Sequence, residues 1–209
     1  FQTFEYLDNV FGSIKISADG DYLTISSLQH PTRRLRPTGD HIFSADDRST
    51  SSHVFLRGKA GEYLISDGFR TYKKVSEIYL AAHWISVLLG LGAILWLLLV
   101  GLMVLLRYRL KMIQHPVTPA FVAVSLFVVP IPFFMGQSFM ALGDFTLASA
   151  LLATVTLLLP LGMLLTIMRI RNRWKKSRLN LLHGLAAILV LQWCTVLMVA
   201  GLMPLRLWV

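Results

Sequence analysis

The sequence predicts a small antiparallel β domain that forms a barrel or half-barrel, followed by an all-α bundle of four transmembrane helices. Up to about residue 76, apolar and polar residues alternate in short runs, as they do in half-buried strands. Residues 77–209 instead contain four long segments without a charged side chain. We therefore expect an extracytoplasmic β domain over residues 1–76 and a transmembrane domain over residues 77–209.

The distribution of charge separates the same two parts of the chain. The net charge of the 209 residues is +9, and 55% of them are apolar. Residues 1–79 carry ten basic and ten acidic residues, whereas residues 80–209 carry ten basic residues and a single acid, Asp144. The excess positive charge thus lies in the apolar part, which is typical of basic membrane loops and argues against a nucleic-acid partner.

The predicted strands follow from alternation and from the turn residues between them. The first hairpin joins residues 13–17 to 22–26 through Asp19-Gly20, a preferred hairpin turn. Further strands are predicted at 33–36, 40–44, 53–57, 61–65 and 71–75, with turns at 37–39, 57–59 and 67–68. One buried face is then expected to carry Ile14, Ile16, Leu23, Ile25, Leu35, Ile42, Val54, Leu56, Leu64 and Val75.

Four segments are long enough to cross a bilayer, at residues 85–106, 117–140, 145–168 and 181–203. The first has 22 uncharged residues, which as a helix span about 33 Å and cover a hydrocarbon layer of about 30 Å. The second contains Pro130, where we expect a kink or a break. Aromatic residues near the segment ends are typical of an interfacial belt (Trp84, Tyr108, Trp174 and Trp208).

Basic residues predict the orientation of the helices and contacts with anionic lipid headgroups. Nine of the ten basic residues after residue 79 lie in two loops, the first with Arg107, Arg109 and Lys111, the second with Arg169, Arg171, Arg173, Lys175, Lys176 and Arg178. Arg206 alone lies on the predicted outer side. The loop at 136–144 has neither Lys nor Arg. The positive-inside rule then places the β domain outside the cytoplasm. Because no export signal is recognisable at the start, we expect one before Phe1, in a longer product of which this is a C-terminal part.

Few polar residues lie within the predicted helices. Gln192 is expected to hydrogen-bond to another helix, and Asp144 to cap the start of the third span. Pairs of small residues, either Ser149 with Ala153 or Gly90 with Gly92, favour close helix packing. Three histidines flank the spans and are interpreted as interfacial anchors (His83, His115 and His183). A transporter is disfavoured because none of the spans contains a charge.

No residue pattern in the chain indicates catalysis, a cofactor or a metal. The sequence lacks Ser-x-x-Lys, Gly-x-Ser-x-Gly, His-Glu-x-x-His and paired-cysteine motifs, and Cys194 is its single cysteine. The spacing of His30, His41 and His53 matches no ligand pattern, so they are interpreted as surface or turn residues rather than metal ligands.

The β part resembles the small lipocalin-like domain that follows the catalytic module in many serine hydrolases related to class C β-lactamases and penicillin-binding proteins. The resemblance rests on Gly12–Ile16, Asp19–Ile25, Leu35–Phe43, Val54–Leu56, Gly61–Leu64 and Tyr72–Val75, and extends to the membrane helices only in layout. Of the family's catalytic signatures, Ser-x-x-Lys and Tyr-x-Asn are absent. The one formal Lys-x-Gly match, at residues 59–61, falls in a predicted turn.

The resemblance implies that the chain anchors and orients an upstream extracytoplasmic serine hydrolase, a peptidase, esterase or amidase, at a bacterial cytoplasmic membrane. The partners are then the lipid bilayer and the catalytic domain of the same polypeptide, and the chain itself supplies no catalytic residue. Two alternatives remain: a membrane sensor or binding module whose β domain binds an envelope ligand, and an assembly subunit of an envelope complex.

Overall fold

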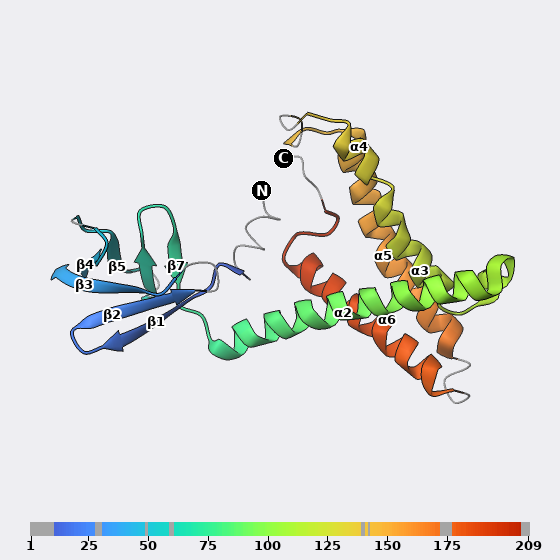
Figure 1. Cartoon of the computed structure of the whole chain (residues 1–209), viewed down its shortest axis with the longest axis horizontal. Coiled ribbons are helices and arrows are strands. Elements are labelled where there is room, and N and C mark those ends of the chain that lie inside the picture. The colour runs from blue at the N-terminus through green and yellow to red at the C-terminus, as the bar shows by residue number, and fades with distance from the viewer. Residues whose placement is uncertain are drawn as a thin grey trace. The chain divides into compact units, whose positions relative to one another are not determined.

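The computed structural model describes residues 11–27, 31–48, 50–58, 61–138, 141, 143–171 and 177–205. The chain forms two compact units, and the boundary between them falls between Ala82 and His83. Figure 1 shows the strands in the first unit and the bundle of long helices in the second. Each unit has its own hydrophobic core, so we describe them separately.

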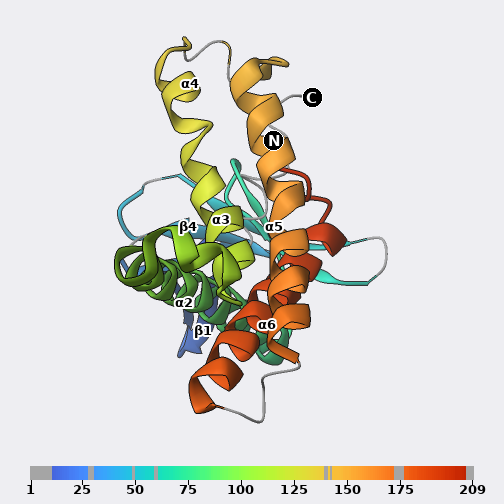
Figure 2. The same cartoon turned by 90° about the vertical axis from the view of Figure 1, so that its right-hand side faces the viewer.

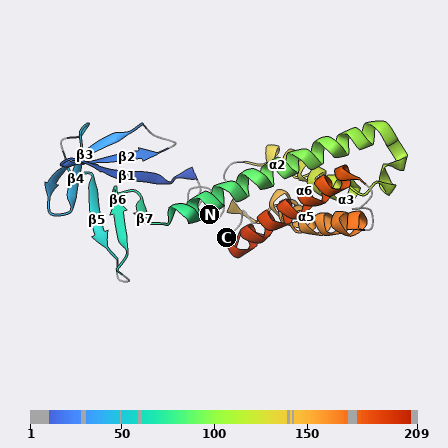
Figure 3. The same ribbon diagram turned by 90° about the horizontal axis from the view of Figure 1, so that it is seen from below.

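The first unit is a single antiparallel sheet whose seven strands follow one another in chain order. The strands are β1 (Ile14–Asp19), β2 (Tyr22–Ser27), β3 (Arg33–Gly39), β4 (Ile42–Ala45), β5 (His53–Arg57), β6 (Tyr63–Ser66) and β7 (Thr71–Lys73). The sheet curls strongly, so that β1–β3 and β5–β7 run in different directions in Figure 3. The prediction of a small antiparallel barrel or half-barrel is confirmed, as a nearly closed barrel of seven strands.

The core of the β unit contains only part of the predicted face. Leu35, Ala45 and Ile65 are buried at its centre. Around them pack Ile14, Ile16, Leu23, Ile25, Phe43, Phe55 and Tyr72. The prediction is therefore correct for β1 to β3 and wrong from β4 onward. Ile42, Val54, Leu56 and Val75 are exposed, and Leu64 pairs with Leu56 on the outer face.

A β-bulge in β3 explains this error. The sequence suggested a turn at residues 37–39, but β3 continues to Gly39 and the chain reverses at Asp40-His41, where His41 has a φ of 59°. The register against β4 then shifts by one residue between Gly39 and Pro37, so that Leu35 pairs with Ala45, and Ala45 and Phe43 face the core. Because side chains alternate along a strand, the register of β3 against β4 also decides which residues of the following strands face the core. The rings of Phe43 and Phe55 meet edge to face, with centroids 5.4 Å apart.

The second unit is built from helices that form four long apolar segments. They are α2 (Glu77–Tyr108), α3 (Thr118–Ser125), α4 (Ile131–Met135), α5 (Leu147–Arg171) and α6 (Arg178–Val199), with 3-10 turns η1 (Arg109–Gln114) and η2 (Leu126–Val128). Four segments are long and apolar enough to cross a membrane: α2, the run Thr118–Met135, α5 and α6. The chain is thus a multi-pass membrane protein, in agreement with the predicted four-helix bundle.

The ends of the helices differ from the predicted spans. Helix α2 begins eight residues before the predicted start at 85, and α6 ends at Val199 rather than at 203. The second span is interrupted between α3 and α4, with Pro130 immediately before α4, so the predicted break is confirmed. Pro160 lies inside α5, which continues through it.

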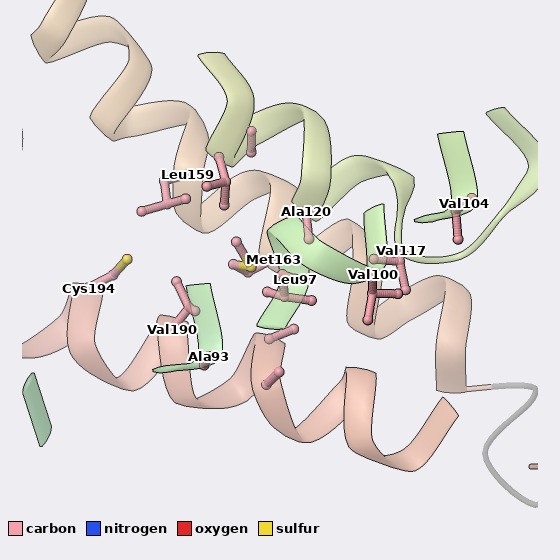
Figure 4. Packing of buried hydrophobic residues seen from close by; sticks show 14 of the residues in the cluster. Ala93, Leu97, Val100, Val104, Val117, Ala120, Leu159, Met163, Val190 and Cys194 are labelled. Atoms are coloured by element: carbon pink, nitrogen blue, oxygen red, sulfur yellow. The ribbon is translucent and has the colours of Figure 1, made fainter. Parts of the chain in front are cut away.

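One core holds the helices together. Leu97 of α2, Ala120 of α3, Met163 of α5 and Val190 of α6 are all fully buried in it, and Figure 4 shows these side chains directed toward one another. Helix α5 packs against both α3 and α6, and Figure 2 shows α3 beside part of α5.

Three glycines allow the helices to approach closely. A Cβ atom added at Gly162 of α5 would overlap the Cβ of Ala123 and lie 2.9 Å from the Pro119 carbonyl oxygen, both in α3. A Cβ at Gly101 would overlap the ring of Phe121. The predicted packing role is confirmed for Gly90, where an added Cβ would lie 2.8 Å from the Trp193 ring.

Candidate functional site

The described residues of both basic loops lie at one end of the helical unit. Arg169, in the last turn of α5, donates a hydrogen bond from Nη1 to the carbonyl of Ile113 in η1, at 3.1 Å. The end of α5 is thereby tied to the connection between α2 and α3. The guanidinium of Arg107 lies 5.8 Å from the ring centre of Tyr108, within the range of a cation–π contact. This end of the bundle therefore carries a concentrated positive charge.

The remaining predicted headgroup residues are exposed where the structure describes them. Arg109 and Lys111 lie in η1, Arg171 ends α5, and Arg178 begins α6. Arg173, Lys175 and Lys176 fall outside the described residues. An exposed guanidinium or ammonium group on a flexible side chain can reach lipid phosphates, so the placement of the described members fits the predicted lipid contact.

Polar contacts join α2 to α6 inside the bundle. Gln192 donates from Nε2 to the Ser86 hydroxyl at 3.0 Å, and that hydroxyl donates to the Gln192 carbonyl oxygen at 3.1 Å. The predicted helix–helix role of Gln192 is confirmed. His183 was expected at the membrane interface, but it is buried and its Nδ1 accepts a hydrogen bond from Trp96 Nε1 at 3.2 Å. The interfacial interpretation is wrong because His183 faces α2.

Two further contacts satisfy backbone groups at helix starts. Thr166 of α5 is fully buried, and its hydroxyl accepts a hydrogen bond from the Ala120 backbone N–H near the start of α3, at 2.9 Å. At the start of α5, the Thr146 hydroxyl accepts from the Ser149 backbone N–H, and the Ser149 hydroxyl accepts from the Thr146 N–H. The predicted cap Asp144 is displaced from this role because it lies three residues before the helix.

The β unit contains a cavity of about 270 Å³. It is lined by Ile14, Ile25, Ser27, Pro31, Arg33, His53, Asp67, Phe69, Arg70 and Tyr72. In an antiparallel meander the start of β1 and the end of β2 lie at one end of the sheet, together with the start of β5 and the β6–β7 turn. The cavity is consequently at that end, whereas β7 leads toward α2 from the opposite end.

Charged and aromatic groups surround the cavity. Arg33 pairs with Asp47 at 3.9 Å, and both side chains are about half exposed (46% and 58%). The carboxylate of Asp67 accepts hydrogen bonds from the backbone N–H groups of Phe69 (2.9 Å) and Arg70 (2.6 Å). Burial lowers the pKa of His53, an effect that Arg48 and Arg33 add to and Asp67 and Asp47 oppose.

No cluster of catalytic or metal-binding type occurs among the described residues. Within those ranges, no three His, Cys, Asp or Glu side chains are grouped so that they could hold a metal ion. His41 lies in the turn between β3 and β4, His53 at the cavity, and His30 outside the described residues. The predicted turn around Lys59-Ala60-Gly61 is described only at its ends, where Gly61 donates to the Gly58 carbonyl.

Sequence reasoning missed the cavity because its lining comes from five strands and two connections. It also missed Thr166 and Trp96, whose partners lie 46 and 87 residues away along the chain. A hydroxyl or indole within an apolar run was the available signal, since a polar group in a bilayer requires a partner.

Comparisons with known proteins identify no relative of the chain: no protein-family model, curated protein or solved structure matches it.

Proposed function

We propose that the chain is a non-catalytic membrane anchor that holds its β unit on the outer face of a bacterial cytoplasmic membrane. The observation that carries this proposal is the hydrogen bond between Arg169 and the Ile113 carbonyl. It brings the ends of two separate basic loops to the same end of the bundle, as a membrane protein with one cytoplasmic face requires.

Helix α2 supports the placement of the β unit on the other side. Three residues join the end of β7 at Lys73 to the start of α2 at Glu77, and α2 then ends beside the basic turn η1. The β unit and the basic loop are therefore attached to opposite ends of one membrane helix. Its 32 residues span about 48 Å, more than the roughly 30 Å hydrocarbon layer.

The role of the anchor in this proposal is to hold and orient an upstream serine hydrolase of the β-lactamase and penicillin-binding-protein type. What supports it is the resemblance of the β part to the accessory domain of such enzymes, together with its layout of a curled sheet followed by membrane helices. In this arrangement the upstream module supplies the nucleophile, and the present chain supplies the position relative to the bilayer.

A serine-directed fluorophosphonate and a fluorescent penicillin test this role. The intact polypeptide should be labelled by at least one probe, and residues 1–209 expressed alone by neither. Substitution of the labelled serine in the intact polypeptide is the matched control and should abolish the signal. An intact product that neither probe labels, or labelling within residues 1–209, would contradict the proposed role.

A binding module is the second candidate function, and the cavity in the β unit favours it. In this alternative the β unit binds an envelope ligand and the helices hold it at the membrane. The two functions are separable, because ligand binding by the β unit requires no upstream catalytic module.

A further inference from the structure

The cavity of the β unit is lined by both apolar and charged side chains. Ile14, Ile25 and Tyr72 line it and also pack against the core of the sheet. Arg33 and Arg70 line it as well, at the start of β3 and in the β6–β7 turn. Half of its lining residues are polar or charged, and its volume of 270 Å³ lies just below the usual lower range of small-molecule sites, about 300 Å³.

Arg33 is better suited to an added anion than the acids near the cavity suggest. Asp67 Oδ1 already accepts two backbone N–H groups in its own turn, so part of its charge is used there. Asp47 lies 3.9 Å from Arg33, and an exposed pair of this length contributes little stability. A carboxylate or phosphate that enters the cavity can therefore replace Asp47 as the partner of the Arg33 guanidinium and form two hydrogen bonds with it, at a small cost in free energy.

Among the residues described in the β unit, Phe69 is the most exposed large apolar one. It lies in the turn after β6, lines the cavity, and leaves 92% of its surface open. A phenyl ring held in this position by the Asp67 turn has no apolar neighbour to cover it fully. The apolar part of a bound ligand would cover part of this ring, and the burial of apolar surface would stabilise the complex.

We propose that this cavity binds a small amphipathic anion, with its carboxylate or phosphate held at Arg33 and its apolar part against Ile14, Ile25 and Phe69. The proposal goes beyond the membrane-anchor function and holds whether or not a hydrolase precedes the chain. The acidic group can come from a fatty acid or from a phosphorylated lipid fragment, and the probes below distinguish these two sources.

The test uses the full chain in nanodiscs of uncharged-headgroup lipid, with octanoate and octyl phosphate as the probes. The methyl NMR signals of Ile14 and Ile25 report on the cavity, and that of Ile42 on the outer face of the sheet serves as the internal control. Saturable shifts of Ile14 and Ile25, with Ile42 unchanged, are expected. The probe with the lower Kd identifies the acidic group. Acetate, which lacks the apolar part, and octylamine, which has the opposite charge, should bind at least tenfold more weakly.

Adjacent arginines on β3 provide matched variants. Arg33→Gln removes a guanidinium from the cavity, whereas Arg34→Gln removes one that pairs with Asp19 at 3.8 Å and does not line it. The first should raise the Kd for the better probe about tenfold, and the second less than twofold. Equal effects of the two substitutions, binding of octylamine as tight as that of octanoate, or no saturable shift with either anion would overturn the proposal.

Discussion

Substitution of Gly162 by alanine tests the close packing of α3 against α5. The added methyl group would overlap the Cβ of Ala123 and lie 2.9 Å from the Pro119 carbonyl oxygen. Neither atom can rotate away, because one is a Cβ and the other belongs to the backbone. Carbon and oxygen atoms in contact normally lie about 3.3–3.6 Å apart, so the two helices must separate by roughly half an ångström or more.

The expected cost follows from this overlap. Overpacking of a well-packed core costs about 1–3 kcal/mol, and rigid obstacles place Gly162→Ala near the upper value. The higher helix propensity of alanine offsets up to about 1 kcal/mol of this cost. We therefore expect a net loss of about 2 kcal/mol in the free energy of unfolding, measured by SDS titration of the chain in mixed micelles with far-UV circular dichroism as the signal.

Gly92→Ala is the matched control, because an added Cβ there meets no atom within 4 Å. It should leave stability unchanged or raise it by up to about 1 kcal/mol. Ala123→Gly by itself should cost about 1 kcal/mol, but it removes one of the two overlaps, so the losses of Gly162→Ala and Ala123→Gly should add up to more than the loss of the double variant. If Gly162→Ala and Gly92→Ala have the same stability, α3 and α5 do not approach as closely as the structure indicates.

The other predictions concern hydrogen bonds and pH. Thr166→Val keeps the side-chain shape but leaves the Ala120 N–H without its acceptor, so it should lower the free energy of unfolding of the helical unit by about 1–3 kcal/mol in the same titration. The control Thr154→Val, at an exposed position, should lower it by less than about 0.5 kcal/mol. Equal losses for the two variants would argue against the hydrogen bond from Ala120 to Thr166. A double-mutant cycle of Ser86→Ala with Gln192→Leu should give a coupling of about 1 kcal/mol, and additive losses would show that the pair contributes nothing. Because burial lowers the pKa of His53, the unfolded chain binds more protons below its ordinary value of 6.5, and the stability of the β unit should fall as the pH drops below that value. Urea unfolding at pH 8 and at pH 5 measures this loss of stability. The difference in unfolding free energy between the two pH values should be smaller for His53→Gln than for the unsubstituted chain.

The strands were predictable from local pattern, but the buried face depended on a bulge that the pattern does not reveal. Alternation located all seven strands, since half-buried strands repeat every second residue. Pro37-Thr38-Gly39 has the composition of a turn, yet the chain reverses at Asp40-His41. The register also shifts by one residue at a bulge between Pro37 and Gly39, and this shift exchanges the faces of the strands that follow, so that Phe43 and Phe55 replace Ile42 and Val54 in the core.

In the helical unit, too, the elements were predictable from local sequence, whereas the contacts between them were not. Length and hydropathy gave the four spans, and Pro130 gave the break in the second. The partners of polar residues depend on helix packing, which the sequence does not specify. Gln192 was assigned a partner on another helix correctly because an amide in a bilayer needs one, whereas His183 near a helix end was equally compatible with the interface and with Trp96.

The sidedness of the β unit is the central claim, and thiol labelling tests it most directly. Cys194 is 1% exposed and unsuitable as a reporter, so the measurement uses the Cys194→Ala background with either Phe69→Cys in the β unit or Gln114→Cys beside the basic loop. An impermeant maleimide added to intact spheroplasts should label the Phe69→Cys variant, and should reach the Gln114→Cys variant only after permeabilisation. Labelling of Gln114→Cys in intact spheroplasts, with Phe69→Cys protected, would contradict the account.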